Sequence, residues 1–157
     1  MKRSAGILPF RFKEGKLQVF LAHFGGPYWR AKKRSWGIVK GEVAEGEELL
    51  EAAKREFFEE TGKRVEGEFY DLGEVKAGNK INHIFAVKAD LDTNIRSNTF
   101  TIEWPPKSGR FEEFPEIDKA AWFDMEEAQE VIVKSQLPFL ERLRALLEER
   151  SSSPGQN

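Results

Sequence analysis

Three glutamates near the middle of the chain have the spacing that a divalent-metal site requires. Glu56 and Glu60 are four residues apart and Glu59 follows Glu56 by three, so on a helix their carboxylates project from neighbouring positions of one side. Without compensation, the three negative charges would repel one another and destabilise the helix. Mg²⁺ prefers oxygen ligands and is usually held by one or two carboxylates together with substrate phosphates. The spacing therefore indicates a site for Mg²⁺, with Mn²⁺ as a possible substitute.

The residues around these glutamates predict a helix that packs on a core. An apolar stripe at helical spacing is formed by Leu50, Ala53 and Phe57. Glu56 and Glu60 border that stripe, so we expect them to face inward, where a carboxylate needs a compensating charge. The alternative interpretation is a solvated acidic helix in which Arg55 pairs with the glutamates around it.

The wider segment from Gly41 to Lys63 resembles the Nudix box, a fixed pattern of glycine, glutamate and arginine positions. The positions that match are Gly41, Glu47, Arg55, Glu56, Phe57, Glu59, Glu60 and Gly62. The last position of the box is normally apolar and is Lys63 here, so we expect Val65 to take over its packing role. The resemblance implies a hydrolase of nucleoside diphosphates linked to another group.

The resemblance also implies roles for single residues. The implied metal ligands are Gly41 through its main-chain carbonyl, Glu56, Glu59, Glu60 and, from a loop outside the box, Glu116. We assign catalysis to Glu56 and Glu59, and to Arg55, which would hold the carboxylates in place. One of the three glutamates Glu56, Glu59 and Glu60 could serve as general base. For Glu116, in the segment EFPEIDKAAWF, an ordinary surface acid is the alternative interpretation.

Basic and aromatic residues before the box are candidates for substrate binding. A basic run would attract a chain of phosphates, and an aromatic ring stacked on a base contributes about 1–3 kcal/mol. The candidates are Lys40, the aromatic pair Tyr28 and Trp29, and the basic run of Arg30, Lys32, Lys33 and Arg34. A solvated strand end, half-buried loop aromatics and an ordinary basic loop are the respective alternatives.

Composition limits the remaining function classes. The 157 residues suggest one domain, which we place at residues 1–150, with a disordered tail over 151–157. A net charge of −2 gives no general attraction to a nucleic-acid polymer or a membrane. The absence of cysteine excludes disulfides and thiolate chemistry, and His23 and His83 are too few for a convincing zinc site. With no long apolar run and no signal sequence, we expect a cytoplasmic enzyme.

Periodicity and breaker residues predict an α/β fold. Strands are expected over residues 4–12, 17–23, 36–39, 68–75, 80–87, 98–104 and 120–123, and helices over 47–61, 125–133 and 137–149. Long loops are expected over 24–35 and 104–110. The resemblance adds an α/β/α sandwich with a mixed sheet between helices.

The sequence thus favours Mg²⁺-dependent hydrolysis of a pyrophosphate bond. The segments SAGILPF, HFGGPYW and EFPEIDKAAWF resemble a bacterial Nudix group described as predicted nucleotide pyrophosphohydrolases. Dinucleoside polyphosphates and nucleoside triphosphates lead the expected substrates, ahead of sugar nucleotides. The competing hypothesis is a non-catalytic Nudix-like module that binds nucleotides, although such modules commonly lose box glutamates and this chain keeps them all. An EF-hand is excluded because the Asp and Asn positions of its loop are missing.

Overall fold

The computed structural model describes residues 2–152 and is built around one long strand, β1 (Lys2–Lys13). Its other strands and helices alternate along the chain as the sequence predicts for an α/β protein. The strands of the main sheet are β2 (Lys16–Phe24), β3 (Trp36–Gly37), β4 (Val39–Glu42), β5 (Phe69–Ala77), β6 (Lys80–Lys88) and β9 (Ile117–Asp124). The helices are α1 (Leu49–Thr61), α2 (Met125–Val131) and α3 (Leu137–Ser152), with short 3₁₀ turns at Pro27–Trp29 and Lys134–Gln136.

The main sheet is mixed and has seven strands, ordered β3-β2-β1-β6-β5, with β4 paired to β1 and β9 paired to β2. β1 runs parallel to β6 along one edge. Along its other edge it pairs antiparallel with two strands in turn, β4 opposite Ser4–Ile7 and β2 opposite Phe10–Lys13. The sheet therefore opens between β4 and β2, and β4 brings the start of the box against the first half of β1.

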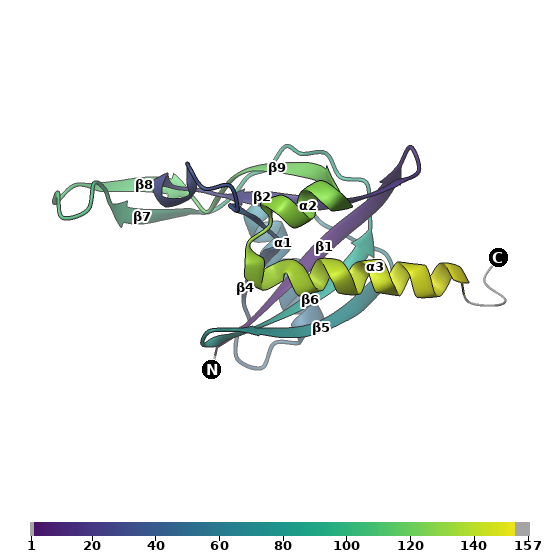
Figure 1. The fold of residues 1–157 in the computed structure, drawn as a ribbon. Coiled ribbons are helices and arrows are strands. Elements are labelled where there is room, and N and C mark those ends of the chain that lie inside the picture. Colours follow the sequence, from purple (N-terminus) through teal and green to yellow (C-terminus); the bar gives the residue numbers. More distant parts are fainter. Residues whose placement is uncertain (1, 153–157) are drawn as a thin grey trace.

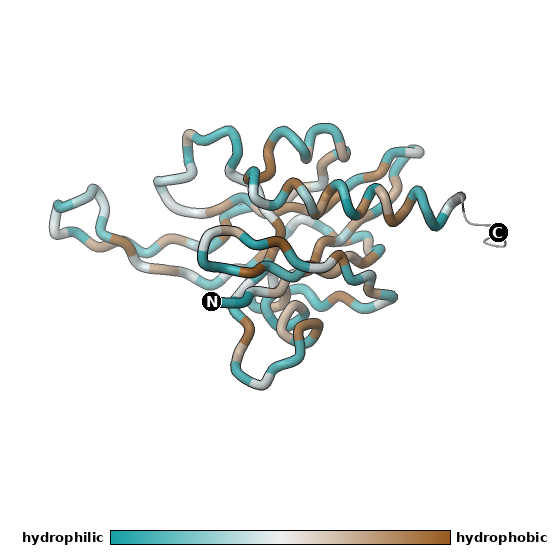
Figure 2. The backbone as a smooth tube through the Cα atoms, turned by 60° about the horizontal axis from the view of Figure 1, so that its bottom comes forward, coloured by the Kyte–Doolittle hydropathy of each residue, from teal (hydrophilic) through white to brown (hydrophobic). Residues whose placement is uncertain are grey.

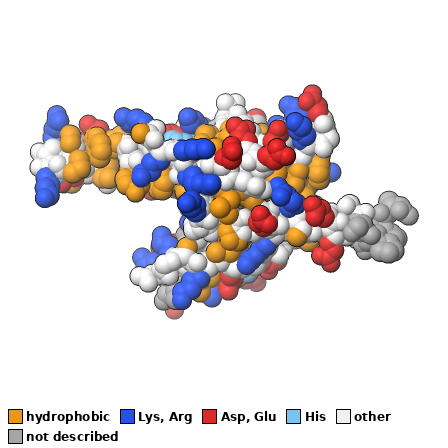
Figure 3. Space-filling model, in the orientation of Figure 1, with side chains coloured by type: hydrophobic (Ala, Val, Ile, Leu, Met, Phe, Trp, Pro, Cys, Tyr) orange, Lys and Arg blue, Asp and Glu red, His pale blue; other side chains and the backbone are white. Residues whose placement is uncertain are grey.

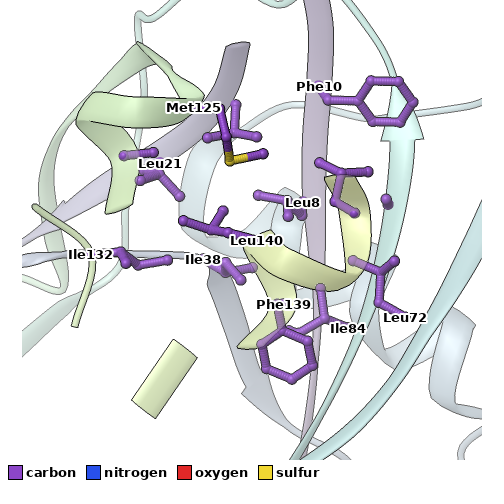
Figure 4. Packing of buried hydrophobic residues seen from close by; sticks show 14 of the residues in the cluster. Leu8, Phe10, Leu21, Ile38, Leu72, Ile84, Met125, Ile132, Phe139 and Leu140 are labelled. Carbon is purple, nitrogen blue, oxygen red and sulfur yellow. The ribbon is translucent and has the colours of Figure 1, made fainter. Parts of the chain in front are cut away.

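Helices cover both faces of this sheet, which confirms the expected sandwich (Figure 1). Successive residues of a strand point to opposite faces. Ile7 of β1 accordingly packs in the cluster that contains Phe57 of α1, whereas its neighbour Leu8 packs in the cluster that contains Leu140 of α3. Figure 4 shows Leu8, Leu140 and their neighbours from α2 and the sheet filling this second layer. In Figure 2, the hydrophobic stretches run through the sheet and the hydrophilic ones lie mostly in the peripheral turns.

A second sheet departs from the sequence prediction. It is a two-stranded hairpin of β7 (Thr99–Glu103) and β8 (Phe111–Pro115), which projects from the body as an arm (Figure 1). The sequence predicted β7 but missed β8, because FEEFP lacks the alternation of a half-buried strand. Phe100 and Phe114 face each other across the arm, with ring centroids 6.2 Å apart. Figure 3 shows hydrophobic side chains along the arm and basic side chains at its tip.

Smaller corrections concern the ends of elements. The box helix begins at Leu49 rather than Glu47, and β9 begins at Ile117, three residues before the predicted start. Ser151 and Ser152 belong to α3 rather than to the predicted tail, and the rest of that tail, residues 153–157, lies outside the described residues. The single domain over residues 1–150 stays a prediction. Between residues 2 and 152, no helix is both long and apolar enough to span a membrane.

Candidate active site

The box helix α1 is fixed by its apolar face and by its last turn. Ala52, Ala53 and Phe57 are buried against the sheet, as the predicted stripe requires. At the C-terminal end Gly62 has φ 78°, a left-handed conformation that glycine adopts at little cost, and its N–H donates to the carbonyl of Phe58 at 2.7 Å. Val65 beyond it is buried, which confirms that it packs where Lys63 does not.

Gly41 lies directly against Glu56. A Cβ at position 41 would stand 2.0 Å from Oε2 of Glu56, closer than any real contact. β4 pairs Gly41 with Ala5 of β1, so the strand cannot easily move away to make room. The box therefore needs a glycine here so that the carboxylate of α1 can approach the backbone of β4.

Three carboxylates from two distant parts of the chain line one cavity. Glu56 and Glu60 reach it from α1, and Glu116 reaches it from the residue before β9. The cavity measures about 270 Å³, and its remaining lining residues are Ala22, Phe24, Gly37, Ile38, Val39, Lys40, Gly41 and Ile117. Of the described residues that line it, Lys40 is the one with a cationic side chain, so acids outnumber bases three to one.

Burial shifts the pKa values of Glu56, Glu60 and Lys40. Burial, and next the negative charge of Glu116, raise the pKa of Glu60 to about 7. Burial also raises the pKa of Glu56, although its hydrogen bond with Arg55 acts in the opposite direction. The pKa of Lys40 is lowered by burial and by the charge of Lys80. Strongly perturbed carboxylates gathered in a cavity are typical of functional sites.

On the neighbouring side of α1, Arg55 collects the other acidic groups of the box. Its Nε and Nη2 atoms donate to the two oxygens of Glu47 at 2.8 and 2.9 Å, and its Nη1 donates to Glu56 at 2.9 Å and to Glu59 at 3.1 Å. Nη2 also reaches the carbonyl of Glu42 at 3.1 Å. These hydrogen bonds raise the pKa of Arg55, and those from Arg55 and the Ala44 N–H lower the pKa of Glu47 to about 2.

The structure thus separates the predicted metal ligands. Gly41, Glu56, Glu60 and Glu116 meet in one cavity, whereas the Glu59 side chain is 40% exposed, pairs with Arg55 and lines a different cavity beyond the helix. Within residues 2–152, no three His, Asp or Glu side chains are already arranged as a metal-ligand set. A cation nevertheless fits the chemistry of the cavity, because the carboxylates of Glu56 and Glu60 are partly buried and the lining offers one cationic side chain against three acidic ones.

The predicted substrate residues are placed unequally around this cavity. Lys40 and Phe24 line the cavity, and the ring of Trp29 packs on that of Phe24 with their centroids 4.8 Å apart. Tyr28 is 62% exposed, and the ammonium group of Lys32 lies 4.5 Å from the centre of its ring.

The basic run itself contains one side chain that is hydrogen-bonded to the backbone and others that are exposed. Arg34 donates to the carbonyls of Gln129 and Ile132 at 2.9 and 2.8 Å, so its guanidinium group is committed to the end of α2. Arg30 and Lys33 are exposed.

Sequence reasoning missed one residue of the site. Ser97 lies between β6 and β7 and places its hydroxyl 3.3 Å from Oε2 of Glu60. No pattern marks it, because it is a single serine in a polar loop. The two histidines stay outside the cavity and pair with aspartates, His23 with Asp118 at 2.8 Å and His83 with Asp71 at 2.6 Å.

Comparisons with known proteins identify the family and the fold. A family model described as the NUDIX domain matches residues 1–143. Among curated proteins, none matches the chain. Solved structures do, at levels of identity that establish similarity of fold.

Three of these structures illustrate the similarity. An Ap4A hydrolase from C. elegans, solved as a binary complex, is 20% identical with a TM-score of 0.65, covering 94% of this chain and 98% of its own. The NUDIX domain of Shewanella oneidensis NrtR, solved with ADP ribose, is 15% identical with a TM-score of 0.65, and the match covers 92% of this chain and 87% of that one. The MutT protein from Methanosarcina mazei Go1 is 19% identical with a TM-score of 0.64, and the match covers 94% of this chain and 95% of that one.

Proposed function

The chain belongs to the NUDIX domain family of pyrophosphohydrolases, and from this premise we propose that it is a Mg²⁺-dependent enzyme that cleaves dinucleoside polyphosphates or nucleoside triphosphates. The observation that carries the proposal is the cavity lined by the carboxylates of Glu56, Glu60 and Glu116 and by one cationic side chain. Such a cavity repels the anionic substrate until a cation neutralises it. Divalent metal and substrate are therefore expected to bind together.

Four groups of this chain would hold the cation: the carboxylates of Glu56, Glu60 and Glu116, and the carbonyl of Gly41. The chemistry that bound Mg²⁺ supplies is the polarisation of phosphoryl oxygens and the activation of water. Each carboxylate has two oxygens, so one that does not face the cation can accept the proton of the attacking water. As water adds to phosphorus, the bond to the bridging oxygen breaks and the leaving phosphate departs.

Two other groups near the cavity would act on the substrate. Lys40 lines it and can donate hydrogen bonds to the phosphate next to the bond that is cleaved. We assign Arg55 a positioning role, because it holds one oxygen of Glu56 at 2.9 Å while its own side chain stays outside the cavity. Glu59, held by the same guanidinium group, is expected to contribute less to catalysis than Glu56 or Glu60.

The choice of substrate rests on the loop before the box. Trp29 and Tyr28 pack edge to face at 5.0 Å beside Phe24, and they offer a base an aromatic surface next to the cavity. Arg30 and Lys33 are exposed on the same loop, where they would attract a longer phosphate chain. The fold similarity to an Ap4A hydrolase is consistent with such a substrate.

A substrate panel tests the proposal. Purified protein is incubated with Ap4A, ATP, GTP and ADP-ribose in Mg²⁺, in Mn²⁺ or in excess chelator, and the mononucleotides and phosphate released are quantified. We expect hydrolysis of Ap4A or of a nucleoside triphosphate in Mg²⁺ and none in chelator. Undiminished hydrolysis in chelator would contradict the metal mechanism, and cleavage of ADP-ribose alone would overturn the substrate assignment.

The competing hypothesis of a nucleotide-binding module without activity predicts binding without turnover in this panel. The retention of all box glutamates argues against it. The cytoplasmic location expected from the sequence stays a prediction.

A further inference from the structure

Three separate segments of the chain meet at the hydroxyl of Ser97. They are the end of α1 with Glu60, the loop that leads into β7, and the first residue of β9. We propose that Ser97 is a positioning residue that holds the Glu60 carboxylate in the cavity and keeps it in register with Glu116. The inference builds on the proposed function, because it concerns the same cavity.

The hydrogen bonds of Ser97 define what it can do. Its oxygen accepts the N–H of Ile117 at 3.1 Å, and this bond ties the loop to β9. Its single proton has two acceptors within reach, the carbonyl of Asn98 at 2.9 Å and Oε2 of Glu60 at 3.3 Å. A hydrogen bond to an ionised carboxylate is roughly twice as strong as one between neutral groups. The proton can therefore turn to Glu60 whenever that carboxylate is charged.

The backbone around Ser97 keeps this arrangement in place. On one side, the N–H of Arg96 donates to the carbonyl of Thr61 at 3.0 Å and fastens the loop to the end of α1. On the other side, the N–H of Glu116 donates to the carbonyl of Asn98 at 2.7 Å. Asn98 and Glu116 flank the β7–β8 arm, so its two ends close against each other beside the cavity.

Among the serines whose side chains the structure describes, Ser97 is the one hydrogen-bonded to a carboxylate of the cavity. The two acids that it links, Glu60 and Glu116, come from distant segments of the chain and line the same cavity. Residues that orient a metal-binding carboxylate typically change metal affinity or activity by about 10–100-fold when they are replaced. Loss of the Ser97 hydroxyl should lower the metal affinity or the activity by a factor in that range.

The first test compares Ser97→Ala with Ser97→Thr, which keeps the hydroxyl. The matched control is Ser108→Ala, because Ser108 also accepts a backbone N–H, from Arg110 at 3.2 Å, but in the distant turn of the arm. Mn²⁺ binding is measured by calorimetry without substrate, alongside kcat and KM. We expect Ser97→Ala to bind Mn²⁺ about tenfold more weakly, and its kcat to fall by a larger factor than its KM changes. Ser97→Thr and Ser108→Ala should resemble the wild type. Mn²⁺ affinity and kcat unchanged in Ser97→Ala would overturn the inference.

A double-mutant cycle separates positioning from general support of the loop. If Ser97 acts through Glu60, then Ser97→Ala should have no further effect on Mn²⁺ affinity in a Glu60→Gln background. Independent, additive losses would contradict the inference.

Metal-free crystal structures of the wild type and Ser97→Ala distinguish this inference from the proposed function. A Glu60 carboxylate that leaves its position in the variant supports the role of Ser97 even if the wild type binds no Mn²⁺, in which case the proposed function alone fails. An unmoved Glu60 carboxylate would overturn the inference whether or not the metal binds.

Discussion

The two sides of helix α1 carry the same residue type in opposite electrostatic states. On one side, Glu59 and Glu47, which lies just before the helix, share the guanidinium group of Arg55 at 2.8–3.1 Å. On the other side, Glu60 lines a cavity with Glu116 and Glu56, and its pKa is raised to about 7, whereas that of Glu47 is lowered to about 2. Glu56 belongs to both sides, because one of its oxygens accepts from Arg55 while the residue lines the cavity.

The difference shows how one acidic helix serves the fold and the site at once. Carboxylates that are paired with an internal arginine stabilise the folded chain and need nothing from outside. Carboxylates that are half-buried without such a partner cost free energy until a cation arrives. The resemblance implies a metal ligand in Glu59 as well as in Glu56 and Glu60 and so does not show this division, which the following predictions test.

The largest effect is expected from the cavity side. Glu56→Gln and Glu60→Gln should each lower kcat/KM by about 10²–10⁴-fold while the protein stays folded, because the amide keeps the volume and removes the charge. Glu51→Gln, on the exposed side of the same helix, is the matched control and should retain activity. Steady-state kinetics and thermal melting measure the effects. Activity within a few-fold of wild type in either cavity variant would remove that residue from the mechanism.

Removal of Arg55 is expected to lower the stability of the fold. Arg55→Met deletes every bond of its network, and we expect the free energy of unfolding in urea to fall by about 1–3 kcal/mol, since bonds to charged groups are strong but this side chain is partly exposed. Arg55→Lys should recover only part of the loss, because an ammonium group cannot reproduce the bidentate contact with Glu47. Arg64→Met, an exposed neighbour, should change stability by less than about 0.5 kcal/mol. An Arg55→Met variant as stable as this control would refute the structural role of the network.

The two sides should also differ in their pH dependence. Because the pKa of Glu60 is raised from 4.5 to about 7, the folded state binds its proton more tightly, and this group makes the metal-free protein less stable as pH rises through that window. The pKa of Glu47 is lowered to about 2, so its stabilisation is present above pH 4.5 and is lost as pH falls toward 2.

Urea unfolding from pH 2 to 8 measures both slopes. Glu60→Gln should flatten the upper slope and Glu47→Gln the lower one. Saturating Mg²⁺ should reduce the upper slope, because a bound cation favours the ionised carboxylate. An upper slope unchanged in Glu60→Gln would assign it to another group.

The smallest effects are expected in the basic loop. A similar contrast recurs there between Arg34, which is hydrogen-bonded to backbone carbonyls, and the exposed side chains of Arg30 and Lys33. Charge reversal of the exposed residues, Arg30→Glu with Lys33→Glu, should lower kcat/KM for Ap4A by a few-fold, more than for ADP-ribose, because each exposed contact contributes only about 0.2–1 kcal/mol. The difference should shrink at high salt. Arg34→Ala should instead lower stability, because its bonds to the carbonyls of α2 are lost. Equal losses on both substrates would show that the loop does not contact the phosphate chain.

Local periodicity explains how much of the structure the sequence could predict. The spacing of Ala53 and Phe57 fixed which face of α1 is buried, and Gly62 marked its end, because both depend on neighbours within a few turns of the chain. The hairpin of β1 and β2 follows from a similar local pattern, whereas the layers of the sandwich and the place of Val65 in the core were expected from the family resemblance.

Tertiary structure decided what local spacing leaves open. The rotation of α1 on the sheet turned Glu60 into the cavity and left Glu59 with Arg55, although both satisfy the same spacing. Chain closure at the base of the arm brought Ser97 and Glu116 to Glu60 from beyond the reach of any helical or strand period. The sequence by itself determined that an acidic helix would pack on a core through its apolar stripe. Long-range packing decides which of its carboxylates pair with arginine and which line the cavity, because burial and charges from distant segments set the pKa of each carboxylate.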